Sequence, residues 1–354
     1  MSKVTFNNSK SPFFDALRSR VDNYFKSQEA KPTGNIKLYF KTGVLLTTLV
    51  SLYLVIVIVN PPLWISNILF VLEGITIAAI GFNVMHDGAH GSYSSVKWVN
   101  DIMGHSLDFL GGSTFMWKAK HNIIHHTYTN VEGMDDDIAI PLMRINTEQE
   151  KKWYHKYQHI YAIFMYALLY IVWIFYTDFA KYFTGKVGDI KYRKMKPYEH
   201  VVFWVTKAIS IFTLFVLPIM VLGWLKAVVG ILIMTTSVGI TISIVFQLAH
   251  IVEDISFPTP HPDTNKIESE WAVHQLNTTA NFATKSKIVS WFVGGLNFQV
   301  EHHLFPKISH IHYPEINKIV KETCKEFNIR YQEFPSVMSA FRSHLSYLKN
   351  IAVA

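Results

Sequence analysis

Five long apolar stretches constrain the fold of this chain more than any other feature of its sequence. A helix needs roughly 20 mostly apolar residues to cross the hydrocarbon core of a bilayer. The stretches of about that length are residues 43–60, 62–82, 160–177, 201–225 and 227–249. They carry only two charged side chains, Glu73 and Lys207, which should face protein rather than lipid because charge is costly in hydrocarbon. Over the whole chain only 17% of residues are charged, against about 25% in a typical soluble domain. We therefore expect an all-α integral membrane protein.

The basic residues between the apolar stretches predict how the chain is threaded, because lysine and arginine gather in cytoplasmic loops. Lysines precede the first stretch, and the short turn at residues 60–62 is uncharged. Lysines and arginines flank residues 160–177 on both sides, at residues 151–156 and 181–196, so we expect this stretch to lie in the interface without crossing. The expected fold has four transmembrane helices, this interfacial helix and a cytoplasmic histidine-rich cap, with both termini cytoplasmic.

The same pattern divides the chain into three expected segments. Residues 1–37 form a cytoplasmic N-terminal segment without an apolar signal-peptide core, residues 38–306 form the membrane domain, and residues 307–354 form a cytoplasmic helical segment. The net charge is +7, but the basic residues cluster between apolar runs, which favours an anionic membrane surface over nucleic acid as the partner. The single cysteine, Cys324, excludes an intramolecular disulfide, a four-cysteine zinc site and a cysteine-ligated iron–sulfur cluster.

Histidines recur at helical spacing in three short windows on the expected cytoplasmic side. His86 and His90 follow the second apolar stretch at the i, i+4 spacing that places two side chains on one helix face. The second window repeats this spacing at His121 and His125, and adjacent His126 is turned about 100° on an ideal helix, enough to face a second ion. The third window contains two adjacent histidines, and a further candidate ends the last apolar stretch: His302, His303 and His250.

Eight imidazoles exceed the four positions of a tetrahedral zinc site and fit two metal ions with open positions. Iron, copper and zinc all accept imidazole, so the ligands alone do not choose the metal. The sequence has no His-Glu-x-x-His string of a zinc protease, and no residue set indicates a serine or cysteine nucleophile or a nucleotide-binding loop. A histidine-rich metal transporter is an alternative, but it would place its histidines within the spans along a path. Here they lie at span ends and in the segments between spans.

The order His-x-x-x-His, His-x-x-x-His-His, Gln-x-x-His-His among membrane spans resembles the membrane fatty acid desaturases. The resemblance runs from about residue 83 to residue 306. The third box opens with Gln299, and in this it resembles the front-end subgroup (delta-5/delta-6, linoleoyl-CoA desaturase-like). The strings at residues 247–250 and 294–297 also resemble that subgroup. That subgroup desaturates between an existing double bond and the carboxyl end. The sequence lacks the His-Pro-Gly-Gly motif of a fused cytochrome b5 domain, so it resembles a bacterial-type member of the inner membrane.

The resemblance implies a specific activity and a specific set of ligands. Two irons would activate O2 and introduce a cis double bond into an acyl chain held as a lipid or thioester, and a separate donor of the ferredoxin or cytochrome b5 type would supply electrons. A fatty acyl or lipid hydroxylase or ketolase of the same superfamily is the alternative. The implied iron ligands are His86, His90, His121, His125, His126, His250, His302 and His303.

Other polar residues beside these histidines are expected to support the ligands or to compete with them. A ligating imidazole normally donates its second ring N–H to a carboxylate or carbonyl. The candidates for a ligand or for such a supporting group are Gln299, His274, Asp87, Glu253, Asp254 and Glu301. By contrast, the acidic run at residues 135–137 is expected to be a solvated loop.

Overall fold

The structure is a computed structural model that describes residues 4–7, 11–138, 140 and 142–354. Nearly all regular structure in these residues is helical, and the strands are two residues long. The chain forms two compact units, each assembled from separated stretches of sequence. Unit 1 comprises residues 1–33, 120–162 and 245–354, and unit 2 comprises residues 34–119 and 163–244. Unit 1 therefore combines both ends of the chain with the second and third histidine windows.

Unit 1 is built from short helices and two small parallel strand pairs. Strand β1 (Thr5–Phe6) pairs with β4 (Lys266–Ile267), and β5 (Asn281–Phe282) pairs with β6 (Glu333–Phe334). The helices that lie wholly within unit 1 are α1 (Pro12–Ser27), α8 (His126–Tyr128), η4 (Trp153–Tyr157), α14 (Trp271–Thr278), α15 (Lys287–Phe292), α16 (Gln299–Leu304), η7 (His310–His312), α17 (Tyr313–Glu326) and α18 (Val337–Ile351).

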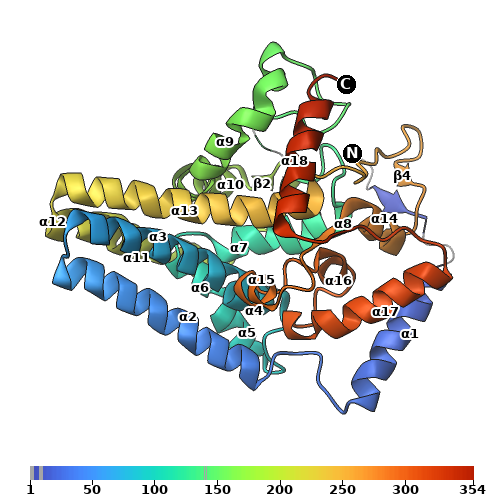
Figure 1. Ribbon diagram of the computed structural model, residues 1–354, viewed down its shortest axis with the longest axis horizontal. Helices are drawn as coiled ribbons and strands as arrows, with labels where there is room; N and C mark the ends of the chain where they lie inside the picture. The colour runs from blue at the N-terminus through green and yellow to red at the C-terminus, as the bar shows by residue number, and fades with distance from the viewer. Residues whose placement is uncertain (1–3, 8–10, 139, 141) are drawn as a thin grey trace. The chain divides into compact units, whose positions relative to one another are not determined.

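The apolar core of unit 1 joins the two ends of the chain. Phe13, Leu17, Val21 and Phe25 recur every fourth residue of α1 and are buried, because this spacing places them on one face of the helix. They pack against buried residues of α14, α16 and α17 in one cluster. Figure 1 shows α1 and α17 side by side. Packing on this core holds α14 and α16, which carry residues of the candidate site.

Unit 2 contains the long apolar helices. Its elements are α2 (Ile36–Leu54), η1 (Val55–Val59), α3 (Leu63–Ile80), η2 (Gly81–Met85), α4 (His86–His90), α5 (Lys97–Gly104), α6 (Ser106–Phe109), α7 (Thr114–Trp117), η5 (Trp173–Thr177), α10 (Asp178–Thr184), β2 (Lys186–Val187), β3 (Ile190–Lys191), α11 (Pro197–Ile211), η6 (Phe212–Val216) and α12 (Leu217–Leu222). Three helices run through a boundary between the units: η3 (Lys118–His125), α9 (Gln158–Val172) and α13 (Trp224–His250). Figure 1 shows α2 and α3 side by side.

Five helical segments of the described chain are long and apolar enough to cross a membrane: Ile36–Val59, Leu63–His90, Trp153–Thr184, Pro197–Leu222 and Trp224–His250. Large apolar side chains stand exposed on them, including Ile58, Phe164 and Val201, which are 73%, 64% and 62% exposed. Exposed apolar surface of this extent fits contact with lipid. The protein is therefore a multi-pass membrane protein, as the sequence predicts, with five candidate spans where four crossings and an interfacial helix are expected.

The two charged side chains within the predicted apolar stretches face protein, as expected. Glu73 and Lys207 are each only 2% exposed. The Lys207 ammonium donates to the carbonyl oxygen of Gly111 at 2.5 Å and lies 2.8 Å from a carboxylate oxygen of Asp178. An opposite charge and a backbone acceptor offset much of the cost of removing the ammonium from water. These contacts tie α11 to α10 and to the turn before α7, all within unit 2.

Candidate metal centre

The second histidine box lies on a π-helical stretch, η3, and continues into α8. Hydrogen bonds from residue i to i+5 widen the turn of a π-helix, and such stretches occur frequently at functional sites. The wider turn brings His121 close to both later histidines of the box. Its ring centroid lies 5.0 Å from that of His125 and 4.8 Å from that of His126. His121 and His125 form the expected i, i+4 pair, but they lie on a π-helix. The turn of about 100° expected between His125 and His126 assumes an ideal α-helix.

His125, His250 and His303 form one group of buried imidazoles in unit 1. Their ligand nitrogens lie within 4.8 Å of one another. The three side chains come from η3, from the last residue of α13 and from α16, so distant parts of the sequence meet here. Among the described residues, no hydrogen-bond partner reaches the buried Nε2 atom of His125 or of His250. A buried polar atom without a partner is costly, and a metal ion would satisfy both.

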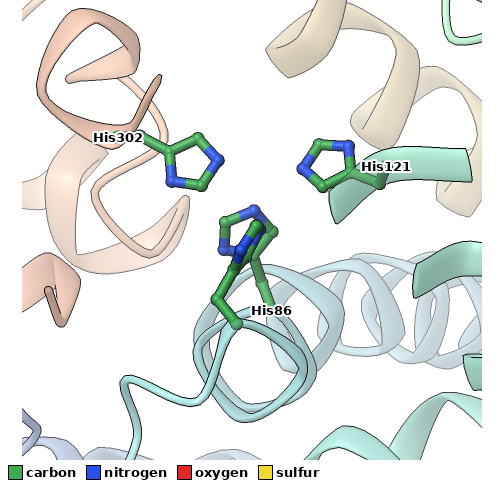
Figure 2. A group of neighbouring side chains, drawn as sticks. His86, His121 and His302 are labelled. Atoms are coloured by element: carbon green, nitrogen blue, oxygen red, sulfur yellow. The ribbon is translucent and has the colours of Figure 1, made fainter. Parts of the chain in front are cut away.

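His126, His302 and His303 form a second group, and their ligand nitrogens also lie within 4.8 Å of one another. The Nε2 atoms of His121 and His126 are 3.3 Å apart. Two nitrogens bound to one ion at about 2.1 Å lie roughly 3–3.5 Å apart, so these two can share an ion. The rings of His121 and His302 lie nearly parallel with centroids 6.0 Å apart, and Figure 2 shows both side chains. His303 belongs to both groups, which together bring five imidazoles of unit 1 close to one another.

In five histidines of unit 1, the ring nitrogen Nδ1 is held by protein. Nδ1 of His121 and of His125 lies 2.9 Å from a carboxylate oxygen of Asp137 and of Asp135, respectively. Three further histidines have similar contacts. Nδ1 of His303 lies 2.8 Å from Oε1 of Gln275, and Nδ1 of His302 lies 3.1 Å from the Tyr313 hydroxyl. Nδ1 of His250 lies 3.3 Å from the Thr278 carbonyl oxygen. An acceptor at Nδ1 keeps the proton there and leaves the Nε2 lone pair for a metal. This pattern is typical of metal-ligating histidine.

The neighbouring Lys120 ammonium favours the ionised state of Asp137. Burial alone would raise the pKa of this carboxyl, but the Lys120 ammonium at 2.6 Å and the hydrogen bond from His121 outweigh burial and hold the pKa well below its usual range. Burial likewise disfavours the charged ring of His125, but the Asp135 carboxylate outweighs it and raises the pKa of His125. The two carboxylates are therefore placed to strengthen the imidazoles as electron donors.

The first histidine box lies in unit 2, on α4. The ring centroids of His86 and His90 are 4.6 Å apart, as expected for the i, i+4 spacing, and Figure 2 shows His86 on its helix. The Trp117 ring meets both imidazoles edge-on, at 5.6 and 5.8 Å. A Cβ at Gly88, between the two histidines, would come within 2.5 Å of the backbone nitrogen of Gly104. The close approach of α4 to α5 therefore requires glycine at position 88.

Comparison with known proteins agrees with this chemistry. The profile of the fatty acid desaturase family matches residues 40–335. The chain is 36% identical to the sn-1 linoleoyl-lipid 6-desaturase of Arthrospira platensis, over 99% of this chain and 95% of that protein. It is 37% identical to the acyl-lipid (8-3)-desaturase of Physcomitrium patens, over 96% of this chain and 72% of that protein.

The chain belongs to the fatty acid desaturase family. It is also 31% identical to the delta(5) fatty acid desaturase A of Dictyostelium discoideum, over 96% of this chain and 75% of that protein. The family resemblance inferred from the histidine boxes is thereby confirmed, and the protein is an oxidoreductase of lipid metabolism with a metal site of the kind that iron occupies in this family.

Three acidic residues expected to support the histidines of the desaturase contact other groups instead. Glu253 accepts a hydrogen bond from the Ser346 hydroxyl at 2.5 Å, and Asp254 forms an ion pair with Arg330 at 3.1 Å. Glu301 is fully buried beside two ligand candidates, but its carboxylate accepts from Asn281, Asn317 and Tyr331. Adjacency in the sequence is a poor guide here, because Glu253 and Asp254 lie in the turn after α13, and Glu301 faces other groups from α16.

The remaining candidates are buried. Gln299 begins α16, one turn before His302 and His303, and is 3% exposed. His274 lies on α14 with its ring against Phe6, and burial lowers its pKa to about 4. Its Nε2 atom has no hydrogen-bond partner among the described residues, yet His274 joins none of the metal-capable groups found there. Asp87 lies between the histidines of the first box and is 1% exposed.

The structure corrects one interpretation and adds two residues. The run at residues 135–137 is not simply a solvated loop, because Asp135 is 4% exposed and, with Asp137, holds two histidines of the second box. Gln275 and Tyr313 hold the two histidines of the third box and are not among the residues that the sequence suggests. They lie 28 and 11 residues from their histidines. A carboxylate shortly after a box is a signal that could have identified Asp135, whereas no local pattern marks Gln275.

Proposed function

We propose that this desaturase acts on an acyl chain esterified in a glycerolipid and has front-end regioselectivity. The observation that carries the proposal is the near full-length similarity to a protein named as an sn-1 linoleoyl-lipid 6-desaturase, together with Gln299 at the opening of the third histidine box. The new cis double bond would form between the carboxyl end and a double bond already present in the substrate.

We further propose that eight histidines hold two iron ions: His86, His90, His121, His125, His126, His250, His302 and His303. Two observations in unit 1 support this. Five of the histidines form two overlapping groups, His125 with His250 and His303, and His126 with His302 and His303. The Nδ1 atoms of five are held by protein, namely those of His121, His125, His250, His302 and His303. For His86 and His90 the support is their helical spacing and the family pattern. A histidine-only set leaves coordination positions open for O2.

The chemistry divides between the metal and the protein. An unactivated methylene C–H bond offers no acid–base handle, so bound iron would supply the O2-dependent oxidation that side chains cannot perform. Acceptors at Nδ1 of five of the histidines keep a proton on that nitrogen and leave the Nε2 lone pair for a metal. The protein also excludes water, since His125, His250 and His303 are fully buried. Electrons would come from a separate donor of the ferredoxin or cytochrome b5 type.

Product analysis tests this function. The full-length protein is expressed in a host whose lipids carry linoleate, and the fatty acids are identified by gas chromatography and mass spectrometry of double-bond derivatives. A new double bond on the carboxyl side of the existing ones is expected, first in glycerolipid and not in the thioester pool. A hydroxylated or oxo product would instead identify the alternative chemistry of the superfamily, and a bond on the methyl side would contradict front-end regioselectivity.

We also propose four membrane crossings, with both termini and all histidine boxes on the cytoplasmic side of a bacterial inner membrane. Three apolar helices separate the second box from His250, namely Trp153–Thr184, Pro197–Leu222 and Trp224–His250. In unit 1, His125 and His250 belong to one group, so the chain must cross the membrane an even number of times between them. Basic residues flank the first of the three helices on both sides, so this helix is the one that we assign to the interface.

Cysteine labelling tests this threading. Single cysteines are introduced near Lys151 and near Lys191 and are treated with a membrane-impermeant thiol reagent in intact cells and in inverted vesicles. The native Cys324 is 1% exposed, which keeps the background low, and Cys324→Ser provides the control. Both sites should react only in inverted vesicles. Reaction of the two sites from opposite sides would show that Trp153–Thr184 crosses the membrane.

A further inference from the structure

A buried glutamine outside the histidine boxes is linked to both of the boxes in unit 1. Gln275 on α14 is fully buried. Its side-chain oxygen lies 2.8 Å from Nδ1 of His303, in the third box, and its side-chain nitrogen donates to the backbone carbonyl of His126, in the second box, at 3.2 Å. The hydroxyl of Thr129 lies 2.9 Å from the same side-chain oxygen.

The contact with the His126 carbonyl determines which way the amide of Gln275 points. A carbonyl oxygen can only accept a hydrogen bond, so the amide NH2 must face His126 and the amide oxygen must face His303. The Trp271 indole donates to the same carbonyl at 3.2 Å, which helps to keep that carbonyl in place.

The orientation of the amide in turn determines the tautomer of His303. An amide oxygen accepts only, so Nδ1 of His303 must carry the proton and donate it. Neutral imidazole has one N–H, and its other nitrogen, Nε2, then presents a lone pair. His303 belongs to two of the metal-capable groups of unit 1, and this tautomer gives it one lone pair with which to bind an ion in either of them.

We propose that Gln275 is a positioning residue for the di-iron centre. It holds His303 in the Nδ1-protonated tautomer and fixes its ring relative to the backbone of the second box. This inference rests on the proposed function, because it assigns His303 as an iron ligand. The sequence draws attention to Gln299, within the third box, but the observed hydrogen bonds single out Gln275.

Two substitutions separate orientation of His303 from general stabilisation. Gln275→Met removes both the acceptor for His303 and the donor to the His126 carbonyl. Gln275→Glu keeps an acceptor for His303 and loses the donor. If the orientation of His303 is what matters, glutamate should restore iron binding and methionine should not. The carboxylate should also make the imidazole a stronger electron donor and lower the reduction potential of the centre.

A matched control is available in the same unit. Gln158 is also fully buried, and its amide bonds to three backbone groups, Arg144 N, Arg144 O and Leu348 O, at 2.8–2.9 Å. None of these partners is a histidine of the boxes. Gln158→Met therefore removes a comparable buried amide and its hydrogen bonds, and it should lower the melting temperature of the iron-free protein without weakening iron binding.

The experiment measures the affinity of the purified full-length protein for Fe(II) by chelator competition, and the melting temperature of the iron-free protein. Loss of a group that orients a ligand typically weakens metal binding about 10–100-fold, and this is the loss expected for Gln275→Met. Gln275→Glu should bind iron like the wild type with a lower reduction potential. The inference is overturned if Gln275→Met binds iron like the wild type, or if Gln275→Glu is as weak as the methionine variant. Should the methionine variant not accumulate, the glutamate variant decides by its affinity and potential.

His303→Ala distinguishes failure of this inference from failure of the proposed function. If His303→Ala loses iron but Gln275→Met retains it, His303 is a ligand and only the role of Gln275 is wrong. If His303→Ala itself binds iron like the wild type, the assignment of the third box is wrong, and the inference about Gln275 fails with it.

Discussion

The first and second histidine boxes have similar spacing in the sequence, yet they are supported in different ways. In unit 1, His121 and His125 lie on a π-helix, and Asp137 and Asp135 hold their Nδ1 atoms. In unit 2, the first box lies on α4, a short α-helix whose backbone packs against α5 at Gly88. The second box is thus fixed by buried hydrogen bonds to charged groups, and the first by close backbone packing. Substitutions of the supporting groups should therefore act differently: loss of a carboxylate should weaken the second box, and added side-chain volume should disturb the first.

The largest effect is expected from removing a ligand in unit 1. His125→Ala should abolish both iron binding and desaturation, because the Nε2 atom of His125 has no other role among the described residues. The protein should still be inserted in the membrane. His261 lies in an exposed loop of the same unit, and His261→Ala is the control that should keep full activity. Iron content and product yield are measured together, and an active His125→Ala enzyme would show that the second box is not a ligand set.

The next prediction compares two buried histidines, His250 and His274. His250→Ala should lose iron and activity, because His250 shares a group with His125 and His303. If His250 were only an interfacial residue at a helix C-terminus, its loss would cost about 1 kcal/mol of stability and leave turnover intact. His274→Ala should keep its iron. The opposite pattern, with iron lost only from the His274 variant, would exchange the two assignments.

A smaller effect is expected from the carboxylate that supports the second box. Asp135→Asn keeps the shape of the side chain but removes its charge, and iron affinity should fall about 10–100-fold. Asp254→Asn is the matched control, since that carboxylate pairs with Arg330 at the surface. Chelator competition on both purified variants provides the comparison. Equal affinities would mean that the Asp135 carboxylate does not tune the ligand.

The smallest effect concerns the packing of the first box. Gly88→Ala would place a methyl group 2.5 Å from the Gly104 backbone and should destabilise unit 2 by about 1–3 kcal/mol. A methyl group at Gly81, in the turn before the same box, meets no atom within 4 Å, so Gly81→Ala should be tolerated. The melting temperatures of the two purified variants are compared. Equal melting temperatures would show that α4 and α5 can move apart without cost.

The sequence predicts the ligand candidates well and their supporting residues poorly. Ligand histidines appear in short windows because helical spacing places them on one face, and His250 is recognisable because it ends an apolar helix. Asp135 supports a histidine ten residues earlier, and Gln275 one that lies 28 residues later. Such contacts depend on how turns and helices pack in three dimensions, which no local spacing specifies.

The fold shows the same division between local and distant information. Each apolar stretch of the sequence overlaps one long helical segment, because length and hydrophobicity are local properties, whereas several helix ends lie outside the stretch that predicts them. The packing of α1 against α17, which joins the two ends of the chain, has no local signal beyond the amphipathic pattern of each helix. The π-helical form of the second box was likewise not predicted, since its histidine spacing also suits an α-helix.

Metal analysis combined with Mössbauer spectroscopy tests most directly whether the histidine boxes hold two irons. The full-length protein is produced with iron-57, purified, and examined before and after reduction. We expect two irons per chain in nitrogen- and oxygen-rich coordination, both lost from the His125→Ala and His303→Ala variants. A single iron per chain, sulfur coordination, or an active enzyme that contains zinc and no iron would contradict the account.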